Sequence, residues 1–237
     1  MLEAIEQNDI ERLEFLLKIS DPNSITLSPL ANLLWDGSYQ KTPLQLACYK
    51  GNMDMIKLLV ENGADVNYTT KSTRYSPLMW AVESQSPHNL EIVRYLIDKG
   101  ADIHYPNYKN KQPAYNLMSC ETLPPNGMEI LKVLMEAGVD SENEMLLHNA
   151  CYWKHEEAIR LFVEEYGYDA SDPYYLRSYC RGVEKYSYET LEYFLERGAN
   201  PYAKDEKGKC AMDYLREESP EWAEKLETLA KKYGFEQ

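Results

Sequence analysis

The sequence lacks the features of a secreted disulfide scaffold and of a membrane protein. Its five cysteines, at positions 48, 120, 151, 180 and 210, are odd in number and include no C-x-x-C pair, whereas small secreted domains pair their cysteines evenly. Its apolar runs are far shorter than the ~20 residues that span a bilayer. The first residues, MLEAIEQND, carry no basic apolar run. We therefore expect no signal peptide, no membrane partner and a cytoplasmic location.

Positive charge is also scarce. The chain has 25 Lys and Arg against 39 Asp and Glu, a net charge of −14. A general nucleic-acid binder needs clustered basic side chains to neutralise phosphates, so we expect no nucleic-acid partner. The phosphate-binding patterns GxGxxG and GxxxxGK(S/T) are absent from the sequence. We expect no cofactor.

What the sequence does have is a pair of short helices with clear start and stop signals, in residues 41–67, KTPLQLACYKGNMDMIKLLVENGADVN. Thr42 can cap the first helix, and Pro43 suits its first position. Apolar residues at intervals of three and four predict a second helix from about Met53 to Asn62, followed by Gly63 as a left-handed cap. Helices this short are marginal alone in water. The pair therefore needs neighbours on both sides.

The segments TPLQLACYKG and IKLLVENGADVN resemble an ankyrin repeat, which has a period of about 33 residues and the signature T-P-L-H-x-A. The same helix start and stop signals recur along nearly the whole chain. The units at both ends are altered, as terminal caps require. The resemblance implies an all-α fold, an ankyrin-repeat solenoid of about six to seven stacked helix-turn-helix units, in a single domain over residues 1–237. We expect a cap, an extra segment, five repeats and a second cap at 1–24, 25–35, about 36–67, 68–104, 105–140, 141–170, 171–201 and 202–237.

Three parts of this scheme are irregular. The fourth repeat, from Met145, lacks the Thr-Pro start and keeps His148 and Ala150 of the signature. The fifth is degenerate in its first helix, which we begin at Leu176. The apolar segment Ile25 to Trp35, ITLSPLANLLW, fits no repeat, and we expect an extra helical turn there.

Acidic and basic residues occupy different parts of each repeat. The second helices carry most of the acid, and the finger loops, which connect one helix pair to the next, are more basic. The resemblance implies that the acidic set lies on a convex outer face, which we interpret as an ordinary solvated surface. The basic set would lie along a concave edge, where it could meet an acidic partner.

Several cysteines and histidines were weighed as chemical sites. His148, Cys151 and His155 have a spacing that suits metal ligands on one helix face. The repeat register explains each of them separately, so we expect no metal site. The resemblance implies that His148 is the signature histidine, which ties loops together by hydrogen bonds, that Cys151 is a small core residue and that His155 is a turn histidine. A Cys-His nucleophile pair, such as Cys120 with His88, has no supporting local motif.

The resemblance places partner recognition on the finger loops and on the first helices. Aromatic side chains are frequent there, and they give large contact areas at little entropic cost. The alternative is that a chain with 20 tyrosines places some of them everywhere. The predicted partner-binding residues are Tyr39, Lys41, Tyr49, Lys50, Tyr75, Glu83, Tyr108, Lys109, Lys111, Tyr152 and Trp153.

These observations predict a non-enzymatic protein-binding scaffold that acts as a monomer and holds one partner protein in a concave groove. A first alternative is an inhibitor or immunity-type protein, whose acidic body neutralises a basic enzyme or toxin. A second is a Cys-dependent enzyme in the degenerate repeats, around Cys120 or Cys180. An effector exported to a host cell is a variant of the scaffold hypothesis.

Overall fold

The computed structural model describes residues 1–24, 41–69, 74–107, 109–140 and 144–236. Within these ranges every regular element is an α-helix, as the sequence predicts. In the same ranges no helix combines the length and the apolar character needed to cross a membrane. The extra turn predicted at Ile25 to Trp35 lies outside the described residues.

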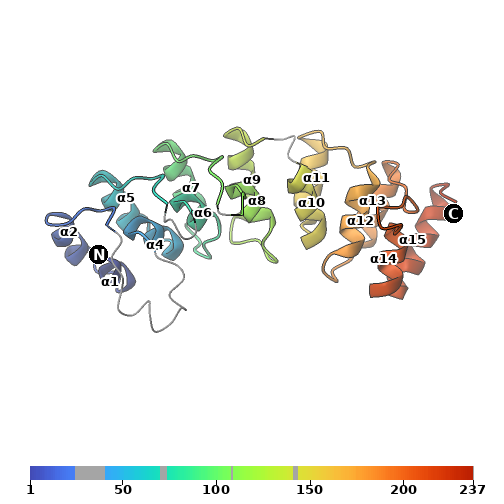
Figure 1. Ribbon diagram of the computed structural model, residues 1–237, viewed down its shortest axis with the longest axis horizontal. Helices are drawn as coiled ribbons and strands as arrows, with labels where there is room; N and C mark the ends of the chain where they lie inside the picture. Colours follow the sequence, from blue (N-terminus) through green and yellow to red (C-terminus); the bar gives the residue numbers. More distant parts are fainter. Residues whose placement is uncertain (25–40, 70–73, 108, 141–143, 237) are drawn as a thin grey trace. The chain divides into compact units, whose positions relative to one another are not determined.

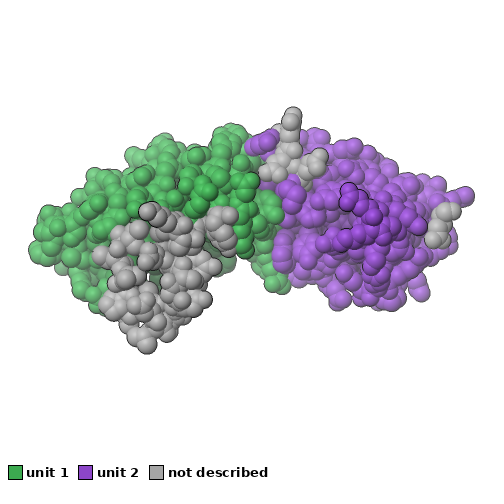
Figure 2. Space-filling view, viewed as in Figure 1, with its two compact units in different colours: residues 1–139 green, residues 140–237 purple. Residues whose placement is uncertain are grey.

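The chain forms two compact units, residues 1–139 and 140–237, coloured green and purple in Figure 2. Each unit is a stack of helix pairs, in which the first helix of one pair packs on the first helix of the next. Figure 1 shows these first helices and the second helices as separate rows within each unit. The single domain over residues 1–237 stays a prediction.

Unit 1 contains four helix pairs in the described part of the chain. Helices α4, α6 and α8 contact one another in sequence in the first-helix row, and α2, α5, α7 and α9 do so in the second-helix row. The pairs are α1 (Leu2–Glu6) with α2 (Ile10–Leu17), α4 (Pro43–Lys50) with α5 (Met53–Glu61), α6 (Pro77–Val82) with α7 (Asn89–Asp98), and α8 (Pro113–Met118) with α9 (Gly127–Glu136).

The start of α4 has the geometry that its sequence predicts. The Thr42 hydroxyl accepts the backbone N–H of Gln45 at 3.2 Å, and the Gln45 side chain accepts the N–H of Thr42 at 2.9 Å. This reciprocal capping box satisfies two donors that the first turn leaves unpaired. Gly51 follows α4 with φ +71° and Gly63 follows α5 with φ +90°, a left-handed conformation that glycine adopts without a steric penalty.

The first and second helices bury their apolar sides against each other. Leu44, Ala47, Ile56 and Leu59 are each at most 1% exposed. The two helices have only eight and nine residues, so most of their stability comes from this packing rather than from helix propensity. The same arrangement recurs in the next two pairs of unit 1.

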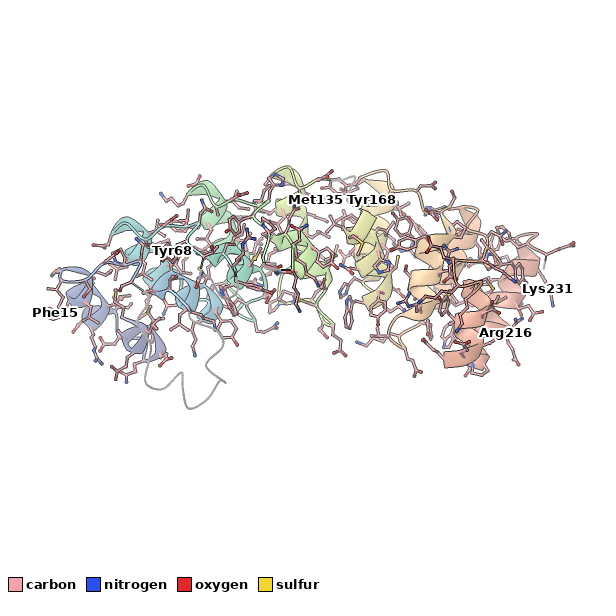
Figure 3. The ribbon with its side chains drawn as sticks, in the orientation of Figure 1. Phe15, Tyr68, Met135, Tyr168, Arg216 and Lys231 are labelled. Atoms are coloured by element: carbon pink, nitrogen blue, oxygen red, sulfur yellow. The ribbon has the colours of Figure 1, made fainter. Side chains whose placement is uncertain are left out.

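Loops after the second helices are tied together by asparagine side chains. The Asn23 amide donates to the carbonyl of Gly63 at 3.2 Å, and its oxygen accepts the N–H of Asp65 at 2.8 Å. The Asn67 amide repeats both bonds one unit further along, to Gly100 and Asp102. Figure 3 labels Tyr68, next to this second asparagine, in the loop after α5. These two asparagines couple successive loops of unit 1.

Unit 2 contains three helix pairs within its described residues. Helices α10, α12 and α14 pack on one another, and α13 packs on α15. The pairs are α10 (Glu144–Trp153) with α11 (Glu156–Glu164), α12 (Pro173–Arg181) with α13 (Tyr188–Glu196), and α14 (Ala211–Glu218) with α15 (Pro220–Lys232). The last of these pairs lies within residues 202–237, where the sequence predicts the second cap, and α15 begins at a proline.

Helix α12, the first helix of the fifth repeat, starts earlier than the sequence predicts. It begins at Pro173, three residues before the predicted start at Leu176, and runs for nine residues. Asp172 accepts the backbone N–H of Tyr174 at 2.8 Å and acts as the N-cap. The segment that looked degenerate is therefore a regular helix, started by an Asp-Pro pair instead of Thr-Pro.

Candidate protein-binding surface

An aromatic cluster joins the first two full repeats of unit 1, and it consists of Tyr49, Tyr75 and Trp80. The Tyr49 ring on α4 meets the Trp80 ring on α6 edge to face, with centroids 5.5 Å apart and an interplanar angle of 82°. The Tyr75 ring lies 5.1 Å from Trp80 on the same repeat. Edge-to-face pairs of this kind add about 0.5–1.5 kcal/mol to the burial of the rings. The cluster therefore gives the surface a rigid apolar centre.

Lys41 lies over this cluster. Its ammonium nitrogen is 4.2 Å from the centre of the Trp80 ring and 5.3 Å from that of Tyr49. Burial lowers the pKa of Lys41, and the nearby charge of Lys50 lowers that pKa further. The cation–π contacts favour the charged form and hold the ammonium in one place. Lys41 therefore presents a fixed positive charge beside exposed aromatic edges.

Glu83, at the end of α6, extends the cluster toward the third repeat. The Tyr75 hydroxyl donates to a Glu83 carboxylate oxygen at 3.1 Å. Burial raises the pKa of Glu83, while this hydrogen bond and the charge of Lys111 act to lower it. Lys111 itself lies 4.6 Å above the ring of Tyr115 on α8. Aromatic rings and charges of three repeats thus follow one another along one face of unit 1.

The structure brings together many of the predicted partner-binding residues. Lys41, Tyr49, Tyr75 and Glu83 meet at Trp80 or next to it, and Lys111 is close enough to Glu83 to influence its charge. Two further lysines are exposed, Lys50 beside Tyr49 and Lys109 in the loop before α8. Tyr39 and Tyr108 lie outside the described residues.

Two members of this surface were not predicted from the sequence. The rings of Tyr49 and Tyr75 both contact Trp80. The ammonium of Lys111 lies above the ring of Tyr115. Trp80 stands directly before the signature alanine of SPLMWA, a position where a large aromatic side chain on a first helix is a detectable signal. Its importance depends on contacts with a neighbouring repeat, which the local pattern does not contain.

Unit 2 has a second aromatic group on its first helices. The Tyr152 and Trp153 rings at the end of α10 meet edge to face at 5.2 Å, and both side chains are partly exposed. His148, on the same helix, stacks on Tyr174 at 5.1 Å, and its Nδ1 lies 2.8 Å from the Ser178 hydroxyl. Burial, and then the charge of Arg181, lower the pKa of His148. The predicted residues of the fourth repeat therefore also lie together.

The bond of His148 differs from the role that the resemblance implied. We expected the signature histidine to tie loops together, but its partner Ser178 belongs to helix α12. Gln45, at the same signature position of the first full repeat, does tie loops, because its amide donates to the carbonyls of Tyr68 and Tyr75 at 3.0 and 2.8 Å. Both side chains link one repeat to the next.

Lys154 closes the end of α10 in an unusual way. It has φ +62°, the left-handed region, at the position that Gly51 occupies after α4. Its ammonium is buried, donates to the backbone carbonyl of Tyr179 and lies 4.4 Å from the centre of the Tyr179 ring. Burial lowers the pKa of Lys154 to about 8. The residue caps the carboxyl end of α12, where a cation interacts favourably with the helix dipole.

The backbones of the fourth and fifth repeats approach closely at the same point. The Val183 N–H donates to the carbonyl of Tyr152 at 3.1 Å. A Cβ atom added at the preceding residue, Gly182, would overlap that carbonyl oxygen. Glycine is therefore required here by the space available and not by its own backbone angles.

The cysteines are poorly placed for nucleophilic chemistry. Cys48, Cys151 and Cys180 are fully buried, and burial raises the pKa of each thiol. Cys120 is partly exposed, and burial together with the charge of Glu83 raises its pKa to about 11. Because the thiolate is the reactive form, these shifts lower thiol reactivity at neutral pH.

No set of three or more His, Cys, Asp and Glu side chains with metal-binding geometry occurs among the described residues. Of the three residues weighed as metal ligands, His148 pairs with Ser178, Cys151 is buried, and His155 is 9% exposed at the start of α11. Each therefore has a position in the packing of the repeats.

Comparison with protein families identifies the repeat. A family model described as ankyrin repeats (3 copies) matches residues 1–107. Residues 1–107 carry ankyrin repeats. No curated protein matches the sequence, whereas ankyrin structures match it over most of its length.

Three solved structures show the same fold. One chain of the complex between the Bd0816 predatory endopeptidase from Bdellovibrio bacteriovorus and the immunity protein Bd3460 aligns with a TM-score of 0.65 at 19% identity, covering 80% of this chain and 99% of that one. The ankyrin repeat protein EF0377 aligns at 0.64 and 21%, covering 83% and 100%. The human ASB11 ankyrin repeat domain aligns at 0.52 and 19%, covering 80% and 98%. These similarities extend the ankyrin fold beyond residue 107.

Proposed function

We propose that this ankyrin repeat protein is a non-enzymatic scaffold that binds a partner protein through the finger loops and first helices. The observation that carries the proposal is the cluster of Tyr49, Tyr75 and Trp80 with Lys41 held above it. Tyrosine, tryptophan and a fixed charge are typical of the residues that dominate binding energy at protein interfaces. A standard interface buries about 1,600 Å² in total, which the first helices and loops of several repeats can supply.

The surface suits binding because its parts are already ordered. Lys41 is held by two rings, and Tyr75 is held by Trp80 and Glu83. Ordering flexible side chains costs about 0.5–1.5 kcal/mol for each one that a complex immobilises. A surface held in this way avoids much of that cost.

The test uses single substitutions of exposed aromatic residues. Tyr49→Ala in unit 1 and Trp153→Ala in unit 2 remove candidate contacts, and Tyr188→Ala is the matched control. Tyr188 is 39% exposed on α13 in the second-helix row, compared with 36% for Tyr49. Each variant is used as bait beside the wild-type chain, after its circular dichroism and unfolding curve have been compared.

We expect a captured partner to be lost with Tyr49→Ala, Trp153→Ala or both, and to be retained with Tyr188→Ala. Loss with one variant alone would assign the interface to the unit that carries it. Equal recovery by all four baits would show that neither first-helix surface binds the partner.

A second candidate function is that of an inhibitor of a basic enzyme. The complex between the Bd0816 endopeptidase and the immunity protein Bd3460 supports it, because one chain of that complex has a fold similar to the fold of this chain. The net charge of −14 supports it too, since complementary charge speeds association. The captured partner separates the two functions. An inhibitor abolishes its partner's catalytic activity and binds much more weakly as salt is raised, whereas a scaffold leaves that activity unchanged.

A further inference from the structure

Two lysines on unit 1 occupy the same position in different repeats. Lys41 directly precedes Thr42, the N-cap of α4, and Lys111 directly precedes Gln112, the N-cap of α8. Each ammonium lies above an aromatic ring of a first helix, at 4.2 Å from Trp80 for Lys41 and 4.6 Å from Tyr115 for Lys111. The repeat between them has Tyr75 in the equivalent place. Two oriented positive charges therefore flank an aromatic side chain.

At the centre of this surface, the indole N–H of Trp80 has no acceptor among the residues that the structure describes. The side chain is 9% exposed, and Nε1 is buried without a hydrogen-bond partner. Leaving a buried donor unpaired costs about 1–3 kcal/mol. The other buried polar side-chain atoms without a partner in the described part of the chain are Tyr95 Oη, Gln112 Oε1 and Asn116 Nδ2. Trp80 differs from these residues because it also lies under the ammonium of Lys41.

The charge of the same face points to the identity of that acceptor. Lys41, Lys50 and Lys111 lie on it or at its edge, in a chain whose net charge is −14. The carboxylate within the cluster, Glu83, already accepts the hydroxyl proton of Tyr75. Positive charge and an unpaired donor therefore both favour an anionic ligand with acceptor oxygens.

We propose that unit 1 binds an extended acidic segment of its partner protein across the N-terminal ends of α4, α6 and α8, from Lys41 past Tyr75 to Lys111. One carboxylate pairs with Lys41 and, after displacing the groups that cover it, accepts the indole N–H of Trp80. A second carboxylate pairs with Lys111, and an apolar side chain between them packs on Tyr75. This inference rests on the proposed scaffold function and specifies the chemistry of the partner.

The repeat spacing sets the distance between the two carboxylates. Packed helix layers are about 8 to 10 Å apart, so two repeats separate the lysines by roughly 16 to 20 Å. An extended strand rises about 3.3 Å per residue. The two acidic residues of the ligand should therefore be about five or six residues apart.

The probe is a fluorescein-labelled peptide of about 12 residues on a Ser/Gly background, in which two Glu residues lie six apart and Leu residues stand two and four positions after the first Glu. In an extended strand these four side chains lie on the same face. Binding to the full chain is followed by fluorescence anisotropy. Comparison peptides carry Gln in place of both Glu residues, or the same Glu residues placed about three apart, a separation too short to reach both lysines.

The variants remove one interaction each. Lys41→Gln and Lys111→Gln delete a charge and keep a long side chain, and Trp80→Phe deletes the N–H and keeps an aromatic ring. Lys132→Gln is the control, because Lys132 is exposed on α9 in the second-helix row. All variants are first checked for wild-type unfolding curves, so that weaker binding is not confused with loss of fold.

We expect the six-spaced peptide to bind about tenfold more tightly than either comparison peptide, and Lys41→Gln, Lys111→Gln and Trp80→Phe each to weaken it about tenfold. Lys132→Gln should bind like the wild type. Equal binding of the Gln peptide, equal binding by the lysine variants, or no binding of any peptide at about 1 mM would each overturn the inference.

The outcome is separable from that of the proposed function. If a captured partner depends on Tyr49 or Trp153 and is not displaced by the acidic peptide, the scaffold function holds and the acidic ligand is wrong. If no partner depends on those residues, the scaffold function fails, whatever the peptide shows.

Discussion

The side-chain amide of Asn67 donates to the carbonyl of Gly100 at 2.9 Å, and its oxygen accepts the N–H of Asp102 at 2.8 Å. The chain separation of 33 residues is one ankyrin period. One side chain thus satisfies two backbone groups in the next loop, and Asn23 does the same one repeat earlier.

Replacing Asn67 with Ala should lower the free energy of unfolding of unit 1 by about 1–2 kcal/mol, because two hydrogen bonds between loops are lost. Urea unfolding followed by circular dichroism measures the effect. Asn62→Ala is the control, since the Asn62 amide donates within its own repeat, to the carbonyl of Leu58. Equal losses for the two variants would contradict a role for Asn67 between repeats.

His104 stands one repeat after Asn67, at the position where a third asparagine could tie two loops together. It follows the sequence ADI as Asn67 follows ADV, and its backbone N–H donates to the Asp102 carboxylate at 2.8 Å. His104→Asn should place an amide near the carbonyl of Gly138 and raise the free energy of unfolding by about 0.5–1 kcal/mol. His104→Ala should not. If the urea unfolding midpoint of His104→Asn is at or below that of His104→Ala, the loops do not accept a third asparagine.

The buried ammonium of Lys154 should make stability depend on pH. Burial lowers its pKa to about 8, against 10.5 for an unperturbed lysine. Between these values the unfolded chain binds more protons than the folded chain, so stability rises with pH. From pH 7 to about pH 10 the gain from this group is about 2 kcal/mol.

The comparison with Lys154→Met isolates this contribution. Burial raises the pKa values of Tyr179 and Tyr186, which acts in the opposite direction at high pH in both proteins. The wild-type chain should gain stability relative to Lys154→Met as the pH is raised. A difference that stays constant with pH would show that Lys154 titrates normally.

The cysteines should differ in their reaction with a thiol reagent in the native state. Cys120, with a pKa of about 11, should react slowly at neutral pH, and about tenfold faster for each pH unit up to that value, because only the thiolate reacts. Cys48, Cys151 and Cys180 are fully buried and should react only when the chain unfolds. Mass spectrometry after timed alkylation measures this order, and early modification of Cys180 would contradict it.

The sequence was sufficient where a rule acts within one repeat. Thr42 and Pro43 predicted the start of α4, and Gly51 and Gly63 fell where their left-handed conformation ends a helix. The same kind of signal, Asp172 with Pro173, stands before α12. The apolar register that begins at Leu176 indicated a later start, which is wrong by three residues.

The sequence was insufficient where contacts cross from one repeat to another. Lys41, Tyr49 and Tyr75 were chosen for their positions, but Trp80, on which all three converge, was not. Lys154 was not predicted either, because it takes a left-handed position that local rules assign to glycine. The hydrogen bond from its ammonium to the Tyr179 carbonyl offsets the cost of this conformation. Because Tyr179 belongs to the next repeat, the sequence around Lys154 does not show this bond.

The close approach of Gly182 to the Tyr152 carbonyl limits which residues can stand at position 182. Any side chain at Gly182 would force the fourth and fifth repeats apart, and Tyr152 and Trp153 would shift with them. The exposed rings at the end of α10 can therefore be exchanged, whereas the position behind them cannot. Whatever side chains replace Tyr152 and Trp153, the glycine at position 182 has to stay.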